Sequence, residues 1–599
     1  MLFRGEAIFG VIDLLQDSRN SSNRAQAMID AARKQGGRVC CKTAGSGTFG
    51  WMGSAAPSAT YSPITTDASC LAVSVGELYE RGEREALYYS EPQRSAFVTR
   101  RFAAEGAAFL RRLDGVFASA IWNESAQELF VSCDWRGDGR IFYTVEEGRF
   151  SFSSWLPLLA SPAPAFDPVA IGEFLRFLYI AAPRTIYRGI ARLEGGRYLK
   201  LSRGHVQLEP LEPAAAAVSE NRSGPDLTEF QDHFETAIRR RVDRRRVGIL
   251  LSGGVDSAAL AAGCERVNPG SVEAFTVGFD NVELDETLAA RALANQIGVP
   301  HRPLCFDLAA YAGAFERVAH DLEQPFGDPV QLPLALACES AKERVDVLCD
   351  GTGSDGLFGA PMPRHLKFSA TLARFVPAPW RHRIAAALRR PGASALSERA
   401  SLFEFDDVEE LFITWSGWSR RELGELLGAG VDFCDSGFYR VFHAQADASA
   451  QQLYDAIGVF PPDDSRFDCA AVARAPLELP NHDVALWSYV RSLPENCRSA
   501  DGGTKVILRR LFARYYPAAG AANKKHYFNM PLDELMARSN YALVNEYLAR
   551  TNLARHGLVD PVRAWRWISR YTAGERSLRF KIWALIVLHA WLDARSAER

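Results

Sequence analysis

The 599-residue sequence lacks the features that mark membrane-spanning, secreted and polyanion-binding proteins. Its best apolar run, Ile582 to Leu588, is far shorter than the roughly 18 residues needed to cross a bilayer, so we expect no membrane span. The first residues show no basic segment followed by a long apolar stretch, so we expect no signal peptide and a cytoplasmic location. A formal net charge of −3 supplies no global basic field, and we expect no nucleic-acid partner.

The 11 cysteines also lack a recognisable pattern. No Cys-x-x-Cys pair occurs, and the adjacent Cys40 and Cys41 do not have the spacing of zinc ligands. We therefore predict reduced thiols rather than a disulfide framework or a zinc site.

Residues 1–210 have the pattern of a β-rich domain. Short apolar runs such as Leu129 to Ser132 and Arg149 to Ser153 recur there between Gly and Asp turn signals. Residues 211–226 are rich in Ala, Pro, Ser and charge, which is typical of a linker. We predict two parts, 1–210 and 227–599, joined by 211–226.

From residue 227 onward, strand-like runs alternate with helical stretches. The predicted elements are a helix over 227–241, strands over 247–251, 272–279 and 345–349, and a helix through 258–264. This alternation predicts an α/β fold with a parallel, doubly wound sheet. From about residue 400 the pattern is mostly helical, which predicts a helical extension.

Arginines cluster at 239–241 and 244–246, at the end of the first predicted helix. Basic residues at a helix C-terminus are favoured by the helix dipole. We interpret the cluster as a solvated face rather than a polyanion site.

A Gly-Gly loop follows the predicted strand over 247–251, and a helix begins directly after it. Glycines permit positive φ and a close approach of backbone to ligand, and amides at a helix N-terminus bind anions. No Gly-Lys-Ser/Thr follows, so this is not a Walker loop. We predict that these residues bind a nucleotide phosphate: Leu251, Ser252, Gly253, Gly254, Val255, Asp256 and Ser257.

A second Gly-rich loop follows the predicted strand over 345–349 and carries Asp355. Open α/β sheets place their sites at the carboxyl ends of strands, so Asp256 and Asp355 should meet there. Two carboxylates beside a polyphosphate suit Mg²⁺, and we predict Asp256 and Asp355 as its ligands.

The first loop resembles the pyrophosphate loop of the ATP-pyrophosphatase enzymes, which release AMP and pyrophosphate. The second resembles the Gly-Glu-Gly-Ala-Asp-Glu-Leu-Phe-Gly stretch of asparagine synthetase. Further similar segments follow in order: Glu323–Pro329, Leu493–Glu495, Lys505–Arg509 and Lys525–Pro531, and in the N-terminal half Leu113–Ala118, Asp134 with Gly137, Phe142–Tyr143, Phe152–Ser154 and Thr185–Leu193.

This resemblance implies a glutaminase-like (Ntn-type) β-sandwich domain followed by an ATP-pyrophosphatase domain. It implies ATP and Mg²⁺ as cofactors, with Lys525, Asp256 and Asp355 as catalytic residues. Lys525 would stabilise charge on the α-phosphate and then on the tetrahedral oxyanion. Further ATP-binding residues implied by the resemblance are Val277, Gly278, Gly351, Gly353 and Ser354.

Three departures from asparagine synthetase concern its reaction. That family begins Met-Cys, and the cysteine attacks glutamine, whereas Leu2 offers no nucleophile. Thr352 stands where the family has Glu and β-lactam synthetase has Tyr, and Gly356 replaces a second acidic residue. We expect the N-terminal domain to remain as a degenerate scaffold and the acceptor site to be altered.

Without ammonia from glutamine, the amine must belong to the substrate. We favour the lasso-peptide cyclases among the relatives, which join a peptide's N-terminal amine to an Asp or Glu side chain. The expected partners are a precursor peptide and possibly a leader peptidase and a leader-binding protein. Trp415, Trp418 and Trp487 could line a peptide cleft or belong to buried core. The alternatives are a small-molecule ligase of the asparagine or β-lactam synthetase type and an inactive peptide-binding homologue.

Overall fold

The computed structural model of the protein describes residues 5–597 apart from 15–17, 54–61, 68, 81–93, 161–163, 212–225, 280–285, 361, 374, 389–399, 401, 406–410, 413–416, 429–435, 445–449, 460–463, 501–502, 518–529, 531 and 540. Leu2, Trp415 and the predicted catalytic Lys525 lie outside the described residues, as does most of the linker predicted at 211–226.

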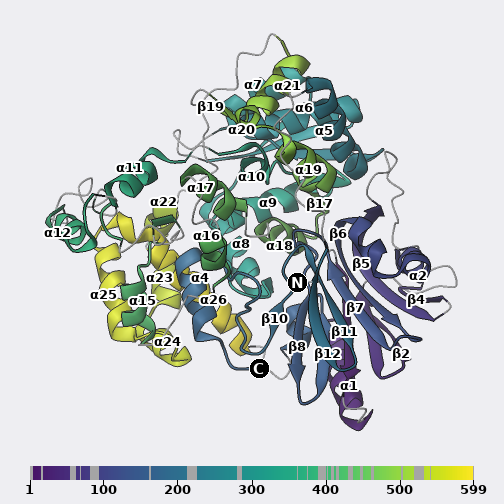
Figure 1. The fold of residues 1–599 in the computed structure, drawn as a ribbon. Coiled ribbons are helices and arrows are strands. Elements are labelled where there is room, and N and C mark those ends of the chain that lie inside the picture. The colour runs from purple at the N-terminus through teal and green to yellow at the C-terminus, as the bar shows by residue number, and fades with distance from the viewer. Residues whose placement is uncertain are drawn as a thin grey trace.

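The N-terminal half is a sandwich of two six-stranded antiparallel sheets (Figure 1). Apolar side chains such as Ile8 and Val73 fill the space between the sheets. Helix α1 (Ser18–Lys34) covers the outer face of the first sheet, and α2 (Arg94–Glu105) covers that of the second. The first sheet has the order β10 (Ala191–Arg192), β8 (Phe142–Glu146), β9 (Arg149–Ser153), β1 (Ala7–Asp13), β3 (Gly47–Gly53), β2 (Arg38–Ala44). The second has the order β12 (His205–Pro210), β11 (Arg197–Ser202), β7 (Glu128–Cys133), β6 (Leu113–Asn123), β5 (Cys70–Glu80), β4 (Ile64–Asp67).

A parallel five-stranded sheet follows, as the alternating pattern predicted. Along β14, Ala274 packs with the helices of one face and Phe275 with those of the other, so the sheet is buried on both sides. The strand order is β15 (His301–Cys305), β14 (Val272–Gly278), β13 (Val247–Leu250), β16 (Val347–Cys349), β17 (Leu477–Glu478). The accompanying helices are α5 (Leu227–Val242), α6 (Val255–Val267), α7 (Thr287–Ile297), α8 (Leu308–Asp321), α9 (Gln331–Ala341) and α10 (Ser354–Phe358).

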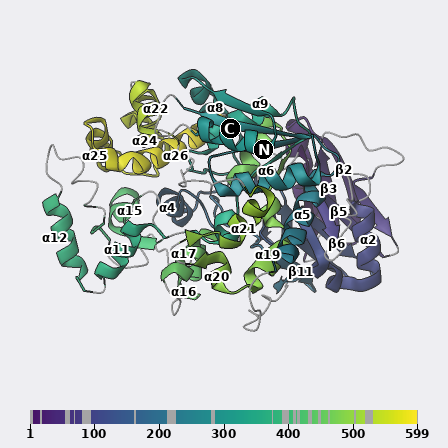
Figure 2. The ribbon, with the colours of Figure 1, turned by 90° about the horizontal axis from the view of Figure 1, so that it is seen from above.

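The remainder is mostly helical. Part of it packs around the long final helix, α26 (Arg579–Ala597), and the helices that precede α26 from residue 484 to 515 pack beside α5 and α6 (Figures 1 and 2). Its run from Ile582 to Leu588 is buried core, as predicted, and no helix in the described part of the chain is long and apolar enough to cross a bilayer. Trp418 is buried in the same core. The other helices are α3 (Leu156–Leu159), α4 (Pro168–Phe177), α11 (Arg364–Ala373), α12 (Ala378–Leu388), α15 (Arg420–Leu427), α16 (Gly437–Ala444), α17 (Ala450–Val459), α18 (Asp464–Ala473), α19 (Val484–Ser492), α20 (Glu495–Arg498), α21 (Val506–Tyr515), α22 (Leu532–Arg538), α23 (Ala542–Tyr547), α24 (Arg550–His556) and α25 (Pro561–Thr572).

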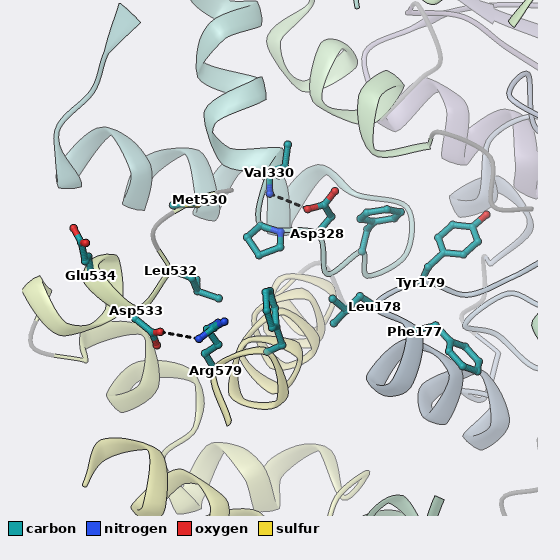
Figure 3. A pocket seen from close by; sticks show the side chains of 13 residues that line it. Phe177, Leu178, Tyr179, Asp328, Val330, Met530, Leu532, Asp533, Glu534 and Arg579 are labelled. Atoms are coloured by element: carbon teal, nitrogen blue, oxygen red, sulfur yellow. Dashed lines mark hydrogen bonds and ion pairs between the residues drawn. The ribbon is translucent and has the colours of Figure 1, made fainter. Parts of the chain in front are cut away.

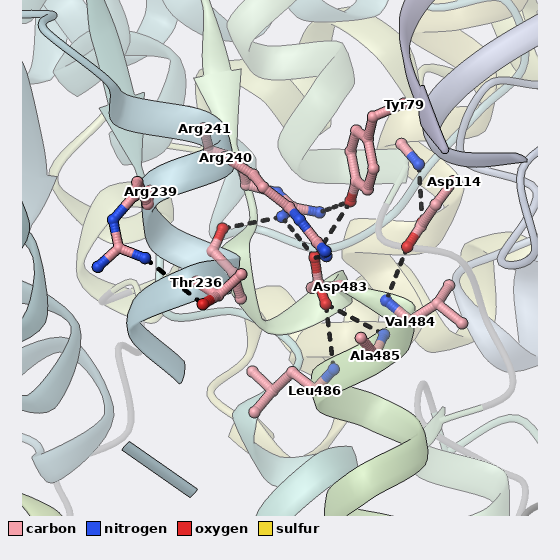
Figure 4. Close-up of polar contacts among 12 residues, drawn as sticks. Tyr79, Asp114, Thr236, Arg239, Arg240, Arg241, Asp483, Val484, Ala485 and Leu486 are labelled. Atoms are coloured by element: carbon pink, nitrogen blue, oxygen red, sulfur yellow. Dashed lines mark hydrogen bonds and ion pairs between the residues drawn. The ribbon is translucent and has the colours of Figure 1, made fainter. Parts of the chain in front are cut away.

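Two arginines of the predicted solvated cluster instead join the two halves of the chain (Figure 4). Arg240 and Arg241 are buried, with Nη1 atoms 2.8 Å and 3.3 Å from Asp483 Oδ2. Arg241 also donates to the hydroxyl of Tyr79, on β5, at 2.9 Å. The interpretation of a solvated face is therefore wrong for these two residues, because their partners lie in distant parts of the chain.

Candidate active site

The first Gly-Gly loop connects β13 to α6 at the carboxyl edge of the parallel sheet. The Ser252 and Ser257 hydroxyls lie 2.9 Å apart, and the Ser252 backbone N–H donates to Ser257 Oγ at 3.0 Å. Gly254 caps α6 without a side-chain hydrogen bond. The first-turn amides of α6 and the positive end of its dipole therefore face this edge, an arrangement that binds phosphate in other proteins.

The two glycines of this loop are needed because neighbouring atoms lie too close for a larger side chain, and neither glycine has a left-handed backbone conformation. Gly254 has φ −89°, and Gly253 is not among the positive-φ residues of the described chain, so neither glycine uses the positive φ that this residue type permits. A Cβ on Gly253 would lie 3.1 Å from Ala289 Cβ, and one on Gly254 would lie 3.3 Å from Ser252 Oγ. Larger residues would crowd the loop.

The second Gly-rich loop packs directly against the first. A Cβ on Gly351 would lie 3.3 Å from the backbone nitrogen of Ser257. Gly353 has φ 88°, and a Cβ there would lie 2.9 Å from the His482 ring, so this position requires glycine. Asn481 Nδ2 donates to Gly351 O at 3.0 Å and to Ser354 Oγ at 2.9 Å. Asn481 therefore holds the loop in place, a role that the sequence did not indicate.

The end of β14 adjoins the same loops. Leu251 N–H donates to Phe275 O at 2.8 Å, and Thr276 Oγ1 donates to Leu251 O at 2.6 Å. Val277 and Gly278 are the last residues of β14, directly beyond these contacts. The structure thus gathers the residues predicted to bind ATP at the carboxyl ends of β13, β14 and β16.

Lys505 is an unpredicted member of this site. Its Nζ lies 2.6 Å from Asp355 Oδ1 and also contacts Asp256 Oδ2, and its side chain is only 3% exposed. Lys505 precedes α21 and has a left-handed φ of 62°. A strained non-glycine conformation beside two functional carboxylates is typical of a functional residue.

The two predicted metal ligands are positioned to share a cation. Asp256 and Asp355 both reach one ammonium nitrogen, so their carboxylates converge on one point. Mg²⁺ commonly takes one or two carboxylates and completes its shell with phosphate oxygens and water, and this donor pair fits that pattern. With Mg²⁺ bound, Lys505 would add a second positive charge toward the phosphates of ATP.

Thr352 is engaged within its own loop. Its N–H and hydroxyl both donate to Asp350 Oδ1 at 2.9 Å. The other oxygen of Asp350 lies 3.6 Å from Nε of Arg466. Thr352 therefore shapes the second loop through Asp350.

A pocket of about 620 Å³ lies between the two halves of the chain and the helical extension (Figure 3). It lies at the N-terminus of α9, which precedes β16 and so begins near the carboxyl edge of the sheet. Most of its wall is apolar and includes Phe177, Leu178, Phe326, Met530, Leu532 and Phe580.

The charged part of the wall is mainly acidic. It comprises Asp328, Asp533 and Glu534, against one cation, Arg579, which lies 3.4 Å from Asp533 Oδ2. Burial raises the pKa of Asp328, and the charge of Arg466 partly opposes this. Since Arg466 also lies beside Asp350, it connects the pocket wall with the second loop.

The N-terminal sandwich contains four cysteines, at 40, 41, 70 and 133, and burial raises the pKa of each. The pKa of Cys41 reaches about 11. A cysteine nucleophile needs a lowered pKa, so none of these four has the environment of an activated thiolate.

Comparison with known proteins identifies the family. The family model for asparagine synthase matches residues 229–593, more than half of the chain, and that for a glutamine amidotransferase domain matches residues 65–212. The chain belongs to the asparagine synthase family. Members of the asparagine synthase family are ATP-dependent, AMP-forming carbon–nitrogen ligases, and this chain is such a ligase.

Similar proteins include a putative glutamine-hydrolysing asparagine synthetase of Mycobacterium tuberculosis (strain ATCC 25618 / H37Rv), 25% identical over 81% of this chain and 77% of that protein. Asparagine synthetase 1 of Bacillus subtilis (strain 168) is 22% identical over 88% of this chain and 85% of its own length. The solved glutamine phosphoribosylpyrophosphate amidotransferase of B. subtilis covers 58% of this chain and 75% of its own at 11% identity, but its TM-score of 0.24 is too low to bear on the fold.

Proposed function

We propose that this member of the asparagine synthase family closes a macrolactam within a precursor peptide, as in lasso-peptide biosynthesis. It would activate an Asp or Glu side-chain carboxylate and join it to the peptide's N-terminal amine. The observation that carries the proposal is the raised pKa of all four cysteines in the amidotransferase-like half, together with Leu2. An enzyme without an activated thiol cannot release ammonia from glutamine, so its amine comes from free ammonia or from the substrate itself, and we infer the second source.

When bound, ATP supplies the α-phosphate that the carboxylate attacks, and Mg²⁺ offsets the charge of the departing pyrophosphate. Asp256 and Asp355 would hold the metal, while the α6 amides and Lys505 would orient the β- and γ-phosphates. Lys525 would stabilise the α-phosphate and then the tetrahedral oxyanion. The amine would replace AMP at the acyl carbon and lose one proton, which leaves an amide.

The 620 Å³ pocket supports a peptide substrate. Its volume falls within the range of sites for drug-sized ligands, which is more room than one amino acid needs. Three carboxylates against Arg579 favour a ligand with a cationic group, such as a free N-terminal amine beside apolar side chains. A leader peptidase and a leader-binding protein would be partners that deliver such a peptide.

Glutamine-dependent asparagine synthesis is the second candidate, and the names of the similar proteins favour it. Asparagine synthesis needs ammonia, which comes either from glutamine through a glutaminase nucleophile or from free ammonia in solution. The two candidates therefore differ in the source of the amine.

The test is incubation of the purified chain with ATP, Mg²⁺ and a peptide that has an N-terminal Gly and an Asp or Glu several residues on. We expect the peptide to lose one water, with the ring mapped to that side chain. Glu534→Gln should raise KM for the peptide but not for ATP, because Glu534 lines this pocket and belongs to neither of the two Gly-rich loops. The matched control is the exposed Glu147→Gln. Asparagine formed from aspartate and ammonia, with no action on peptides, would contradict the proposal and support asparagine synthesis instead.

A further inference from the structure

Helices α11 and α12 follow one another at the periphery of the molecule, and we refer to the two together as the α11–α12 hairpin. Both views place α12 at one end of the molecule, remote from the sandwich (Figures 1 and 2). The hairpin is anchored from its inner side, where Ser369 Oγ donates to Leu402 O at 2.9 Å. Arg381 is buried, donates to Phe405 O at 2.9 Å and lies 4.2 Å from the centre of the Phe405 ring. These contacts fix which face is turned outward.

Four large apolar side chains in and between these two helices are exposed. Phe368, Phe375, Trp380 and Ile384 are 51%, 79%, 59% and 37% exposed. They make up half of the eight large hydrophobic residues that are exposed in the described part of the chain, within a span of 17 residues. A cluster of exposed aromatic residues on an anchored element indicates an interaction surface for an apolar partner, such as a protein or a membrane.

The charged residues of the segment that contains these two helices are all basic. Residues 361–397 include no Asp or Glu, and their Lys and Arg residues are Arg364, Lys367, Arg374, Arg381, Arg383, Arg389 and Arg390. Arg364, Lys367 and Arg383 are exposed beside the aromatic residues. The guanidinium of Arg383 lies 4.9 Å from the centre of the Trp380 ring. The whole chain has a net charge of −3, so this basic segment is a local feature.

We propose that the α11–α12 hairpin docks on an anionic lipid membrane. Helices with Trp and Phe on one side and Lys and Arg around them lie in the membrane interface, where the rings sit at headgroup level and the cations meet anionic lipid. The position of α12 at one end of the molecule suits contact with an extended, deformable surface. The hairpin would hold the enzyme at the membrane without a spanning helix, a property beyond the proposed ligase reaction.

The experiment is co-sedimentation of the purified full chain with vesicles of phosphatidylcholine alone or with about one-third phosphatidylglycerol, at low and physiological salt. We expect binding to the anionic vesicles only. Phe375→Ser and Trp380→Ser should each weaken it by roughly tenfold, because each removes most of the apolar area of one ring. Arg364→Gln and Lys367→Gln should each weaken it by roughly fivefold.

Val562→Ser is the matched control, since Val562 is 60% exposed on α25 and lies outside the hairpin. It should bind vesicles as the unaltered chain does. Circular dichroism and AMP formation report whether each variant is folded, because the substituted side chains are exposed and lie outside the active site. Equal binding to neutral and anionic vesicles, or no loss in Trp380→Ser, would overturn the proposal. Binding to polyglutamate but not to vesicles would overturn it in favour of an acidic protein partner.

Discussion

Lys505 Nζ lies 2.6 Å from Asp355 Oδ1, although 150 residues separate the two in the sequence. The same ammonium contacts Asp256, so one lysine joins both carboxylates predicted to hold Mg²⁺. The site thus contains a fixed positive charge where the pyrophosphate of ATP would be held.

Lys505→Met should lower ATP–pyrophosphate exchange by roughly a hundredfold, because it removes a buried charge aimed at the leaving group. It should also lower the melting temperature, since two like charges lose their shared partner. Lys505→Arg keeps the charge and serves as the matched control. Unchanged exchange in Lys505→Met would show that the contact with Asp355 is structural only.

Lys525→Ala should reduce turnover far more than ATP affinity, because its charge would act mainly in the transition state. Steady-state kinetics and nucleotide titration separate the two effects. Lys524→Ala is the control in the adjacent position. Equal losses of turnover and ATP affinity in Lys525→Ala would make Lys525 a binding residue.

Glutamine should not be hydrolysed, because none of the four cysteines of the N-terminal sandwich has an activated thiol. Glutamate release is the measurement, with Cys41→Ser as a variant that should behave as the unaltered chain. Glutamate formed at the rate of ATP consumption would contradict this prediction.

Glu173 should make stability depend on pH. Burial raises its pKa to about 8, and the guanidinium of Arg184, 3.7 Å away, opposes only part of this. Between roughly pH 4.3 and 8 the unfolded chain has lost this proton while the folded chain keeps it, so the contribution of Glu173 to stability falls as pH rises. Glu173→Gln stays neutral, and its melting temperature relative to the unaltered chain should rise from pH 5 to pH 8. A difference that does not change with pH would refute the assignment.

The strand–loop–helix elements of the site could be predicted because their signals are local. The run from Val247 to Val267 contains a buried strand, the Gly253-Gly254 pair and a helix start in sequence order. Lys505 and Asn481 could not be assigned a role in this way, because their partners lie more than a hundred residues away and only the tertiary fold brings them together.

The prediction for two residues of the arginine cluster is wrong because local sequence does not show long-range partners. A basic helix end is usually solvated, but Asp483 and Tyr79 provide buried partners for Arg240 and Arg241. Burial would raise the pKa of Asp483, and the two arginine charges outweigh burial and hold the pKa below its usual range. Sequence spacing carries no sign of a partner 243 residues away.

The most direct test follows one oxygen atom. The chain is incubated with ATP, Mg²⁺ and a peptide that has a free N-terminal amine and oxygen-18 in its side-chain carboxyl group. The masses of the peptide and nucleotide products are then measured by mass spectrometry. The predicted result is a cyclic peptide that has lost one labelled oxygen and AMP that has gained it, because the carboxylate attacks the α-phosphate and the amine then displaces AMP. ADP with the label in inorganic phosphate, or unlabelled AMP beside an unchanged linear peptide, would contradict the account.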